Sequence, residues 1–287
     1  MSDQLKGILI TLLGVLFVVP DSLFVRLIDA PTLTIAFWRT FTQGIVLLCV
    51  MALILGRRYP QKIKEVGWVS IPFGVTVTTS GLLFVTAVQY TTVANVVIII
   101  ATTPIFAAFF SWLWLGERVS KRMIWTMLFA IIGVVIIGFG SIEPDSNSTL
   151  LGDSLALLTA ALFAVSITCA RSVSPISITP VVPVAFLIMS GVLFFFVDPW
   201  NVDPGDWIWV FLHGGIFVAA SSALLSYGPK FITSAEVALL ILLESIFAPI
   251  LAWFIIREVP GAWTLWGGSL VLLTLIISNA IALRRAK

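Results

Sequence analysis

The sequence predicts an all-α polytopic membrane protein with ten transmembrane helices, arranged as two inverted five-helix repeats around a central cavity. Three observations lead to this fold class: the composition, the apolar runs and an internal repeat. Residues of the AVILMFWYC set make up 60% of the 287 residues, charged residues make up 10%, and the mean hydropathy is +1.12. A soluble domain of this length has too little interior to hide that much apolar surface, so lipid must solvate much of it.

Apolar segments of about 20 residues, long enough to cross a bilayer, follow one another along the chain. Short polar connections with turn residues separate them, as at Asp29-Ala30-Pro31. The first run lacks an A-x-A cleavage site and continues through Pro20, so we expect a mature helix rather than a signal peptide. The expected spans lie at about 7–28, 32–55, 67–88, 93–115, 122–140, 152–171, 178–197, 207–228, 233–256 and 262–283.

The internal repeat is clearest in the fourth span of each half. Residues 91–117 read TTVANVVIIIATTPIFAAFFSWLWLGE, and residues 232–258 read ITSAEVALLILLESIFAPILAWFIIRE. The two segments align without a gap, so that Glu117 matches Glu258. The chain is therefore predicted to contain two copies of one unit.

The domain organisation follows from this repeat. We expect a first five-helix repeat at 1–140, a hinge loop at 141–151 and a second repeat at 152–287. Five spans are an odd number, so the second copy enters the membrane upside down relative to the first. Inverted repeats of this kind are typical of carriers, whose halves can open one face of the membrane and then the other.

The placement of the charges predicts the orientation. The side that we expect to carry Arg26 and Arg257 also carries six acidic residues: Asp29, Glu143, Asp145, Asp198, Asp203 and Asp206. Apart from Arg39, which lies inside a span, the other side collects the remaining basic residues: Lys6, Arg57, Arg58, Lys62, Lys64, Arg118, Lys121, Arg122, Arg171, Lys230, Arg284, Arg285 and Lys287. An excess of Lys and Arg belongs in the cytoplasm, which places both termini there.

The repeated segment also resembles a known family. The first copy has Thr103-Pro104 followed by WLWLGE at 112–117, and the second has Leu243-Glu244 followed by WFIIRE at 253–258. Two five-helix copies with this fourth helix are similar to the EamA-type members of the drug/metabolite transporter superfamily. The resemblance covers nearly the full length and implies an inner-membrane carrier with ten helices around a central cavity. Such proteins mostly export amino acids, metabolites or drugs, and some import.

The chain departs from the family pattern at two places. The family often reads Leu-Glu-Pro where this chain has Leu243-Glu244-Ser245, and the proline here lies four residues later, at Pro249. Arg257 also replaces the usual glycine before the closing glutamate. The first departure shifts the place where the ninth span is expected to break, and we expect Pro20, Pro104 and Pro249 to act as hinges.

Ionisable residues inside a span are candidates for function because burying them is costly. Asp21 and Arg39 lie at the same depth in one hairpin, each about seven residues from its outer turn, or roughly 10 Å below the surface. We expect the two side chains to pair. The pair is either a permanent structural ion pair or a site at which the substrate competes for one member.

Glu244 and Glu236 in the ninth span are candidates for coupling transport to protons or cations. Glu244 lies about eleven residues into its span, close to the bilayer midplane, whereas Glu236 lies nearer the cytoplasmic end. The alternative for Glu244 is a structural carboxyl hydrogen-bonded to a neighbouring helix. For Glu236 the alternative is a carboxylate stabilised by the dipole of its helix N-terminus.

Three further residues complete the candidate substrate site. Trp38 could stack on a planar or cationic substrate or face lipid. His213 is either a packed neutral side chain or a ligand of the substrate. Asn95 occupies the position in the first copy that Glu236 occupies in the second.

Other classes of protein need patterns that are missing here. An enzyme needs a nucleophile with a base, a metal cluster or a phosphate-binding loop, and the sequence has a single histidine. We therefore expect no enzyme activity, no cofactor, no metal and no nucleic-acid partner. Cys49 and Cys169 lie inside apolar runs and predict neither a disulfide nor a metal site. An ion channel would need rings of repeated polar residues.

The favoured function is an inner-membrane secondary carrier that exports a small organic metabolite, such as an amino acid, an amine or a drug-like compound, with proton coupling as one option. Uptake of a metabolite or vitamin is the alternative among carriers, and a non-transporting membrane scaffold is the alternative from another class. The expected partners are the substrate, the lipid bilayer and protons. The protein itself is expected to be a monomer or a homodimer.

The charge asymmetry makes a testable prediction about topology. Single cysteines at positions 60 and 146, in a background without Cys49 and Cys169, should react differently with a membrane-impermeant maleimide on intact cells. Position 146 should be labelled because it is periplasmic, and position 60 should be protected because it is cytoplasmic. Labelling at position 60 without labelling at 146 would reverse the orientation.

Overall fold

The computed structural model describes residues 3–116, 121–142, 148–173, 176–227 and 234–286, and the regular structure in these residues is helical. Helices are the expected outcome, because a chain in lipid must satisfy its backbone N–H and C=O groups within each spanning segment. The helices of the first half are α1 (Asp3–Val18), α2 (Asp21–Leu27), α3 (Thr32–Leu55), α4 (Tyr59–Val66), α5 (Ser70–Tyr90), α6 (Val93–Ile100), α7 (Thr103–Leu115) and α8 (Lys121–Gly140).

The second half has the same sequence of spans. Its helices are α9 (Leu150–Ser172), α10 (Val182–Phe194), α11 (Trp207–Val210), the π-helical segment η4 (Phe211–Val218), α12 (Ala219–Tyr227), α13 (Ser234–Ile256) and α14 (Ala262–Ala286). Short 3₁₀ turns at Gly56–Arg58, Gly67–Val69 and Thr179–Val181 flank α4 and precede α10. Segments α11, η4 and α12 follow one another without a gap and make one span.

The predicted spans are present. Six segments of the described residues are long and apolar enough to cross a membrane, and one of them, Thr32–Tyr90, holds both α3 and α5. Shorter apolar helices at Thr179–Phe194, Leu240–Ile256 and Ala262–Ser278 supply the remaining three of the ten spans. The chain is thus an all-α polytopic membrane protein.

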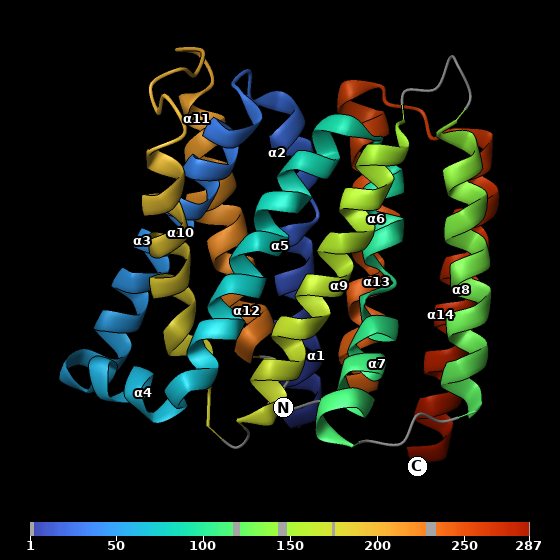
Figure 1. Ribbon diagram of the computed structural model, residues 1–287, viewed down its shortest axis with the longest axis horizontal. Coiled ribbons are helices and arrows are strands. Elements are labelled where there is room, and N and C mark those ends of the chain that lie inside the picture. The colour runs from blue at the N-terminus through green and yellow to red at the C-terminus, as the bar shows by residue number, and fades with distance from the viewer. Residues whose placement is uncertain (1–2, 117–120, 143–147, 174–175, 228–233, 287) are drawn as a thin grey trace.

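The two halves run in opposite directions. In Figure 1, α1 rises from the edge that holds both termini, whereas α9, the first helix of the second half, descends towards that edge. The third span of each half packs on the first helix of the other half: α5 lies against α9, and α12 lies against α1. Equivalent helices also pair directly, α3 with α10, α6 with α13, and α8 with α14. This pairing is what a two-fold relation between inverted copies produces.

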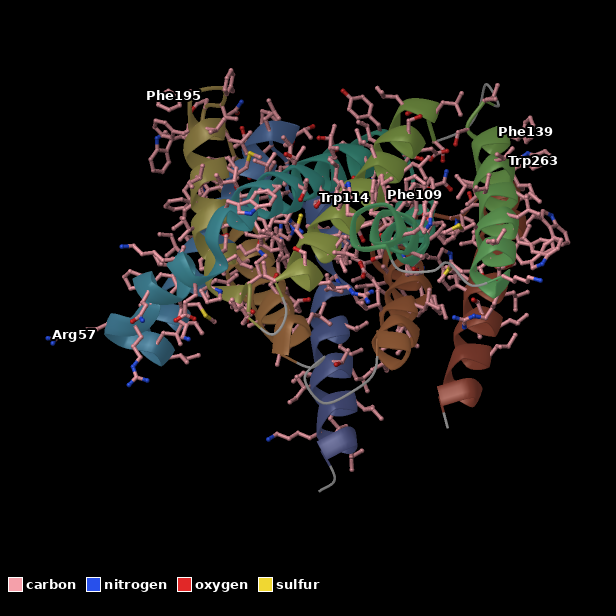
Figure 2. The ribbon with its side chains drawn as sticks, turned by 60° about the horizontal axis from the view of Figure 1, so that its bottom comes forward. Arg57, Phe109, Trp114, Phe139, Phe195 and Trp263 are labelled. Carbon is pink, nitrogen blue, oxygen red and sulfur yellow. The ribbon has the colours of Figure 1, made fainter. Side chains whose placement is uncertain are left out.

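The sides of the bundle expose large apolar side chains. Phe139 and Trp263 project from the α8–α14 pair, and Phe195 projects from the end of α10 at the opposite edge (Figure 2). Phe195 is 83% exposed and Trp263 41%. Arg57 lies at the edge that holds the termini. Apolar surface on this scale is stable only against lipid.

Two of the three expected helix breaks are found. α1 ends at Val18 and α2 begins directly after Pro20, and α6 ends at Ile100 before α7 begins at Thr103-Pro104. Near the second break the hydroxyls of Thr102 and Thr103 donate to the carbonyls of Ile99 and Ile100, at 2.5 and 2.6 Å. The Ile100 carbonyl needs such a donor because Pro104, four residues on, has no N–H, whereas the Ile99 carbonyl also accepts the Thr102 N–H at 3.0 Å.

The expected break near Pro249 is wrong. α13 runs without interruption from Ser234 to Ile256 and carries Pro249 inside it. Proline removes one intrahelical hydrogen bond, to the carbonyl of Ser245, but the helix continues on both sides. The hydroxyl of Ser245 is bonded elsewhere, to the carbonyl of Val97 on α6 at 3.0 Å, which ties α13 to its counterpart.

The fourth span ends in the same unusual backbone conformation in both copies. Gly116 has a φ of 67° and Arg257, its match in the repeat, has a φ of 58°. A left-handed residue at this place is a common way to end a helix, and glycine adopts it without strain. Arginine carries a Cβ, so the conformation costs about 1 kcal/mol at Arg257.

This difference predicts opposite effects of two substitutions. Arg257→Gly should raise the free energy of unfolding by about 1 kcal/mol because it removes the Cβ strain. Gly116→Ala should lower it by a similar amount, and the cost is backbone strain alone because an added Cβ meets nothing within 4 Å. Thermal unfolding of the purified protein in detergent measures both. A lower melting temperature for Arg257→Gly would mean that the arginine side chain contributes more than its strain costs.

Candidate functional site

The break at Pro20 places Asp21 at the start of α2, inside the bundle. The Asp21 residue is 3% exposed, so its carboxylate needs charged or hydrogen-bonding partners. Arg39 on α3 supplies them: Nε donates to Oδ1 at 3.1 Å and Nη2 donates to Oδ2 at 2.7 Å. The pairing predicted from depth in the hairpin is confirmed, and it has the two-pronged geometry that makes Arg–carboxylate pairs strong.

The Arg39 guanidinium is also held from α5. Its Cζ atom lies 5.5 Å from the centre of the Phe84 ring, and Nη1 sits beside Gly81, 3.1 Å from where a Cβ would be. Glycine at this position therefore makes room for the guanidinium. The ion pair links α2, α3 and α5.

His213 is the third member of the cluster, and sequence reasoning did not predict its partner. Its Nε2 lies 2.6 Å from Oδ1 of Asp21, and its ring stacks on Phe24 with the centres 5.7 Å apart. The adjacent Gly214 packs on the α3 backbone so closely that a Cβ would lie 2.7 Å from the Arg39 carbonyl oxygen. The glycine pair after His213 is the sequence signal for this close approach of η4 to α3.

Asp21 is thus shared by two groups from different halves of the chain. Arg39 belongs to the first copy and His213 to the second, and both residues are buried, at 8% and 1% exposure. The structure shows the cluster enclosed by protein. A substrate that competed for Asp21 would have to replace these charge-assisted hydrogen bonds. Substrate binding at this cluster stays a prediction.

Glu244 on α13 stands apart from these bonds. Its side chain is half-buried, and within the described part of the chain no group donates a hydrogen bond to it. Its carboxyl interacts electrostatically with Asp21 and Arg39, so it faces the same interior. The side chain of Glu236, the second coupling candidate, lies outside the described residues.

Trp38 is directed away from the cluster. Its indole Nε1 donates to the carbonyl of Pro199 at 2.8 Å, and its ring packs edge-on against Trp207 with the centres 5.1 Å apart. Trp38 therefore packs the connection between α10 and α11 against the N-terminal part of α3. This contact favours a packing role, and stacking on a substrate remains a prediction.

Asn95 belongs to a separate buried polar cluster. Its Nδ2 donates to Oδ1 of Asp153 at 3.0 Å, and its Oδ1 accepts from the Thr264 hydroxyl at 2.5 Å. The hydroxyls of Ser141 and Thr91 donate to Asp153 at 2.6 and 2.7 Å. Sequence reasoning missed Asp153 because it read this residue as the start of a span, and Asn95 does not meet Asp21 or Arg39 in these contacts.

Two hollows lie away from the cluster. One of about 610 Å³ opens at the face opposite the termini and is lined by Asp29, Ala30, Pro31, Asn201, Val202, Asp203 and Pro204. The other, of about 310 Å³, lies between α6, α13 and α14 and includes Ile98, Ser245, Pro249, Trp253 and Thr264. Among the described residues, no group of His, Cys, Asp or Glu is arranged to hold a metal ion.

Comparison with known proteins identifies similar chains. The model of the EamA-like transporter family matches the sequence twice, over residues 5–139 and 150–280. An uncharacterized transporter of Archaeoglobus fulgidus is 26% identical over 267 residues, which are 90% of each chain. An uncharacterized transporter of Synechocystis, sll1164, is 28% identical over 225 residues. That match covers 72% of this chain and 63% of the relative, so the chain spans less than two thirds of the Synechocystis protein.

A solved structure shares the fold. A crystal structure described only as that of a protein superposes with a TM-score of 0.65 at 16% sequence identity. The match covers 97% of this chain and 99% of the other. At this identity the likeness concerns the fold alone.

The ion pair predicts a non-additive pattern of stability. Asp21→Asn and Arg39→Gln should each lower the free energy of unfolding by about 3 kcal/mol, because each leaves the other charge buried without its partner. The double variant should lose less than the sum of the two, since it leaves neither charge behind. Thermal unfolding in detergent of the three variants provides the comparison. Strictly additive losses would show that the two side chains do not depend on each other.

Proposed function

Because the chain belongs to the EamA-like transporter family, we propose that it is a secondary carrier that exports a small organic metabolite in exchange for protons. The chain is a membrane transporter by family and by fold. The substrate, the direction and the coupling belong to the proposal. The observation that carries it is the Glu244 carboxyl, which lies in the interior without a hydrogen-bond partner among the described residues.

The charges around Glu244 support this role. Arg39, the cation of the interior cluster, is already bonded through two nitrogens to Asp21. Glu244 therefore has an acidic neighbour, Asp21, and a cation that is already paired. A carboxylate in the middle of a span is costly unless a positive charge accompanies it. A proton and a positively charged substrate are the two species that can alternately neutralise the Glu244 carboxylate.

This alternation is enough for exchange. When the proton is bound on one side of the membrane, the substrate is excluded, and when the substrate is bound, the proton is released. The substrate class that fits is a compound with a protonated amine, such as an amino acid or an organic amine. The enclosed Asp21–Arg39–His213 cluster is the place where its polar groups would be recognised.

The proposed orientation places both termini in the cytoplasm of the inner membrane. Both termini lie at one edge of the bundle, which also carries α4 (Figure 1). The segment from Arg57 to Lys64, which covers the end of the 3₁₀ turn before α4 and most of α4 itself, contains four basic side chains. Basic residues near span ends favour the cytoplasmic side. Export then proceeds from this edge towards the face that carries Asp29 and Asp203.

Glu244→Gln tests the coupling. The amide imitates a carboxyl that never loses its proton, so substrate exchange at equal concentrations should survive while accumulation driven by a pH gradient should disappear. A gradient of one pH unit can sustain about tenfold accumulation per proton, since one unit corresponds to about 1.4 kcal/mol. Proteoliposomes loaded with a pH dye and offered a panel of amines, amino acids and neutral metabolites report both quantities.

Glu65→Gln is the matched control. Glu65 carries the same side chain at the cytoplasmic edge, where Oε2 accepts from Lys62 at 2.8 Å, and its loss should leave both assays unchanged. If Glu244→Gln protein accumulates a substrate on the pH gradient at the wild-type rate, the coupling role is wrong. If no compound on the panel moves and none shifts the melting temperature of the wild type, a scaffold becomes the better reading.

A further inference from the structure

Glu258 lies at the outer end of the bundle, just beyond α13. The left-handed conformation of Arg257 turns the chain after Ile256, and the Glu258 side chain is 15% exposed. Its match in the first copy, Glu117, lies outside the described residues. The proposed function makes no use of Glu258, although it closes the repeated segment.

The Glu258 carboxylate joins three segments. Oε1 accepts the backbone N–H of Val93, the first residue of α6, at 2.5 Å. Oε2 lies 3.5 Å from Nη2 of Arg26 on α2, and the same Nη2 donates to the carbonyl of Thr91 at 2.9 Å. The end of α13 in the second copy is therefore fastened to α2 and to the start of α6 in the first.

Residues 91–95, which the Glu258 and Arg26 side chains contact, are also bonded to α9 and α14. The hydroxyl of Thr91 and the amide of Asn95 both donate to Asp153 at the start of α9, and Thr264 of α14 donates to Asn95. These bonds hold the turn between α5 and α6 to two helices of the second copy. Residues 91–95 are thus one of the places at which both halves meet at the outer face, beside the contacts of Asp29 with Asp206 and of Trp38 with Pro199.

We propose that Glu258, Arg26 and the N-terminus of α6 form an outer lock, which keeps the extracellular end of the carrier closed and must part before that end can open. The lock deepens the proposed function, since only a carrier needs such an opening. Oε1 of Glu258 and Nη2 of Arg26 are the atoms whose bonds to Val93 and Thr91 must break. Nε of Arg26 is buried without a hydrogen-bond partner among the described residues. An unsatisfied buried donor raises the free energy of the closed state, so this state is easier to open.

The bond to Val93 contributes more to the lock than the charge of Glu258. The distance to the Val93 nitrogen is 2.5 Å, against 3.5 Å to Arg26. Burial raises the pKa of Glu258 above its usual range, although Arg26 and the Val93 N–H act to lower it. The cost of burying the charge therefore exceeds the attraction, and an uncharged acceptor at position 258 should hold the lock.

Val97 is a suitable reporter of the closed state. It lies on α6 one turn deeper than Val93 and on the same face, and it is 3% exposed. Val97→Cys is made in full-length protein without Cys49 and Cys169. The rate of labelling by a membrane-impermeant maleimide from the outer side of intact cells measures how often the outer end opens. This assay needs neither a substrate nor a proton gradient, so it stands even if Glu244 has no role in coupling.

Glu258→Ala should speed the labelling of the Val97→Cys reporter about tenfold, the factor that corresponds to about 1.4 kcal/mol for a lost charge-assisted hydrogen bond. Glu258→Gln should leave the rate close to that of the parent, because its amide oxygen can accept the Val93 N–H. The control is Asp203→Ala, which removes an outer carboxylate that bonds Gly205 within its own loop. It should have no effect.

Equal rates for Glu258→Ala and the parent would overturn the lock, provided that the variant elutes from size-exclusion chromatography as a single peak. If Glu258→Ala does not fold, Arg26→Ala provides the same test from the other side of the contact, and an unchanged rate there would be equally decisive. Labelling of Glu258→Gln as fast as that of Glu258→Ala would also contradict the account, since it would make the charge the essential part.

The pH dependence supplies an independent check. A carboxyl with a raised pKa in the closed state binds its proton more tightly there than in the open, hydrated state. Lowering the external pH through that pKa should therefore favour the closed state and slow the labelling of Val97→Cys, after correction with a cysteine at the exposed position 203. Arg26 from α2 is the charged group that acts on Glu258, while Asp153 of α9 bonds Thr91 instead. Faster labelling in acid would refute this sign.

Discussion

The carboxylate of Asp21 is the interaction on which the interior depends. A buried charge is tolerated only when its neighbours satisfy it, and here Arg39 and His213 approach it from opposite halves of the chain. The break at Pro20 brings the carboxylate inward, Gly81 makes room for the guanidinium, and Gly214 lets η4 approach α3. One helix break and two glycines that lie far apart in the sequence therefore all help to form this cluster. Because both copies contribute, any movement of one half against the other must change these bonds.

The interior and the outer face are connected through the same helices. α2 carries Asp21 at its start and Arg26 near its end, so a shift of this short helix acts on the charge cluster and on the contact with Glu258 together. α13 makes a similar connection, since it carries Glu244 in its middle and leads to Glu258 beyond its end. Two helices, the short α2 and the long α13, thus reach both the interior charged groups and the proposed lock. Alternating access requires a mechanical link of this kind between the binding site and the opening.

Part of the candidate site could be predicted from sequence and part could not. The Asp21–Arg39 pair was accessible because both residues lie in one hairpin, where equal distance from the turn means equal depth. His213 lies 192 positions from Asp21, and no periodicity links such distant residues. Asp153 escaped notice because a carboxylate at the start of a helix is usually solvated, whereas here the turn before α6 covers it. The break expected near Pro249 was wrong because a proline alone does not decide whether a helix breaks or continues.

The sequence by itself determined that lipid surrounds the chain, where the membrane spans lie and that the chain contains a repeat. Twenty-residue apolar runs admit only helices in lipid. The gapless match of 91–117 with 232–258 indicates two copies, and five spans in each copy make them run in opposite directions. The tertiary structure alone decided which polar groups meet: His213 at Asp21, Glu258 at Val93, and Asn95 at Asp153. The physical reason is that spacing along one helix is fixed by its pitch, whereas contacts between helices of different copies depend on how the whole bundle packs.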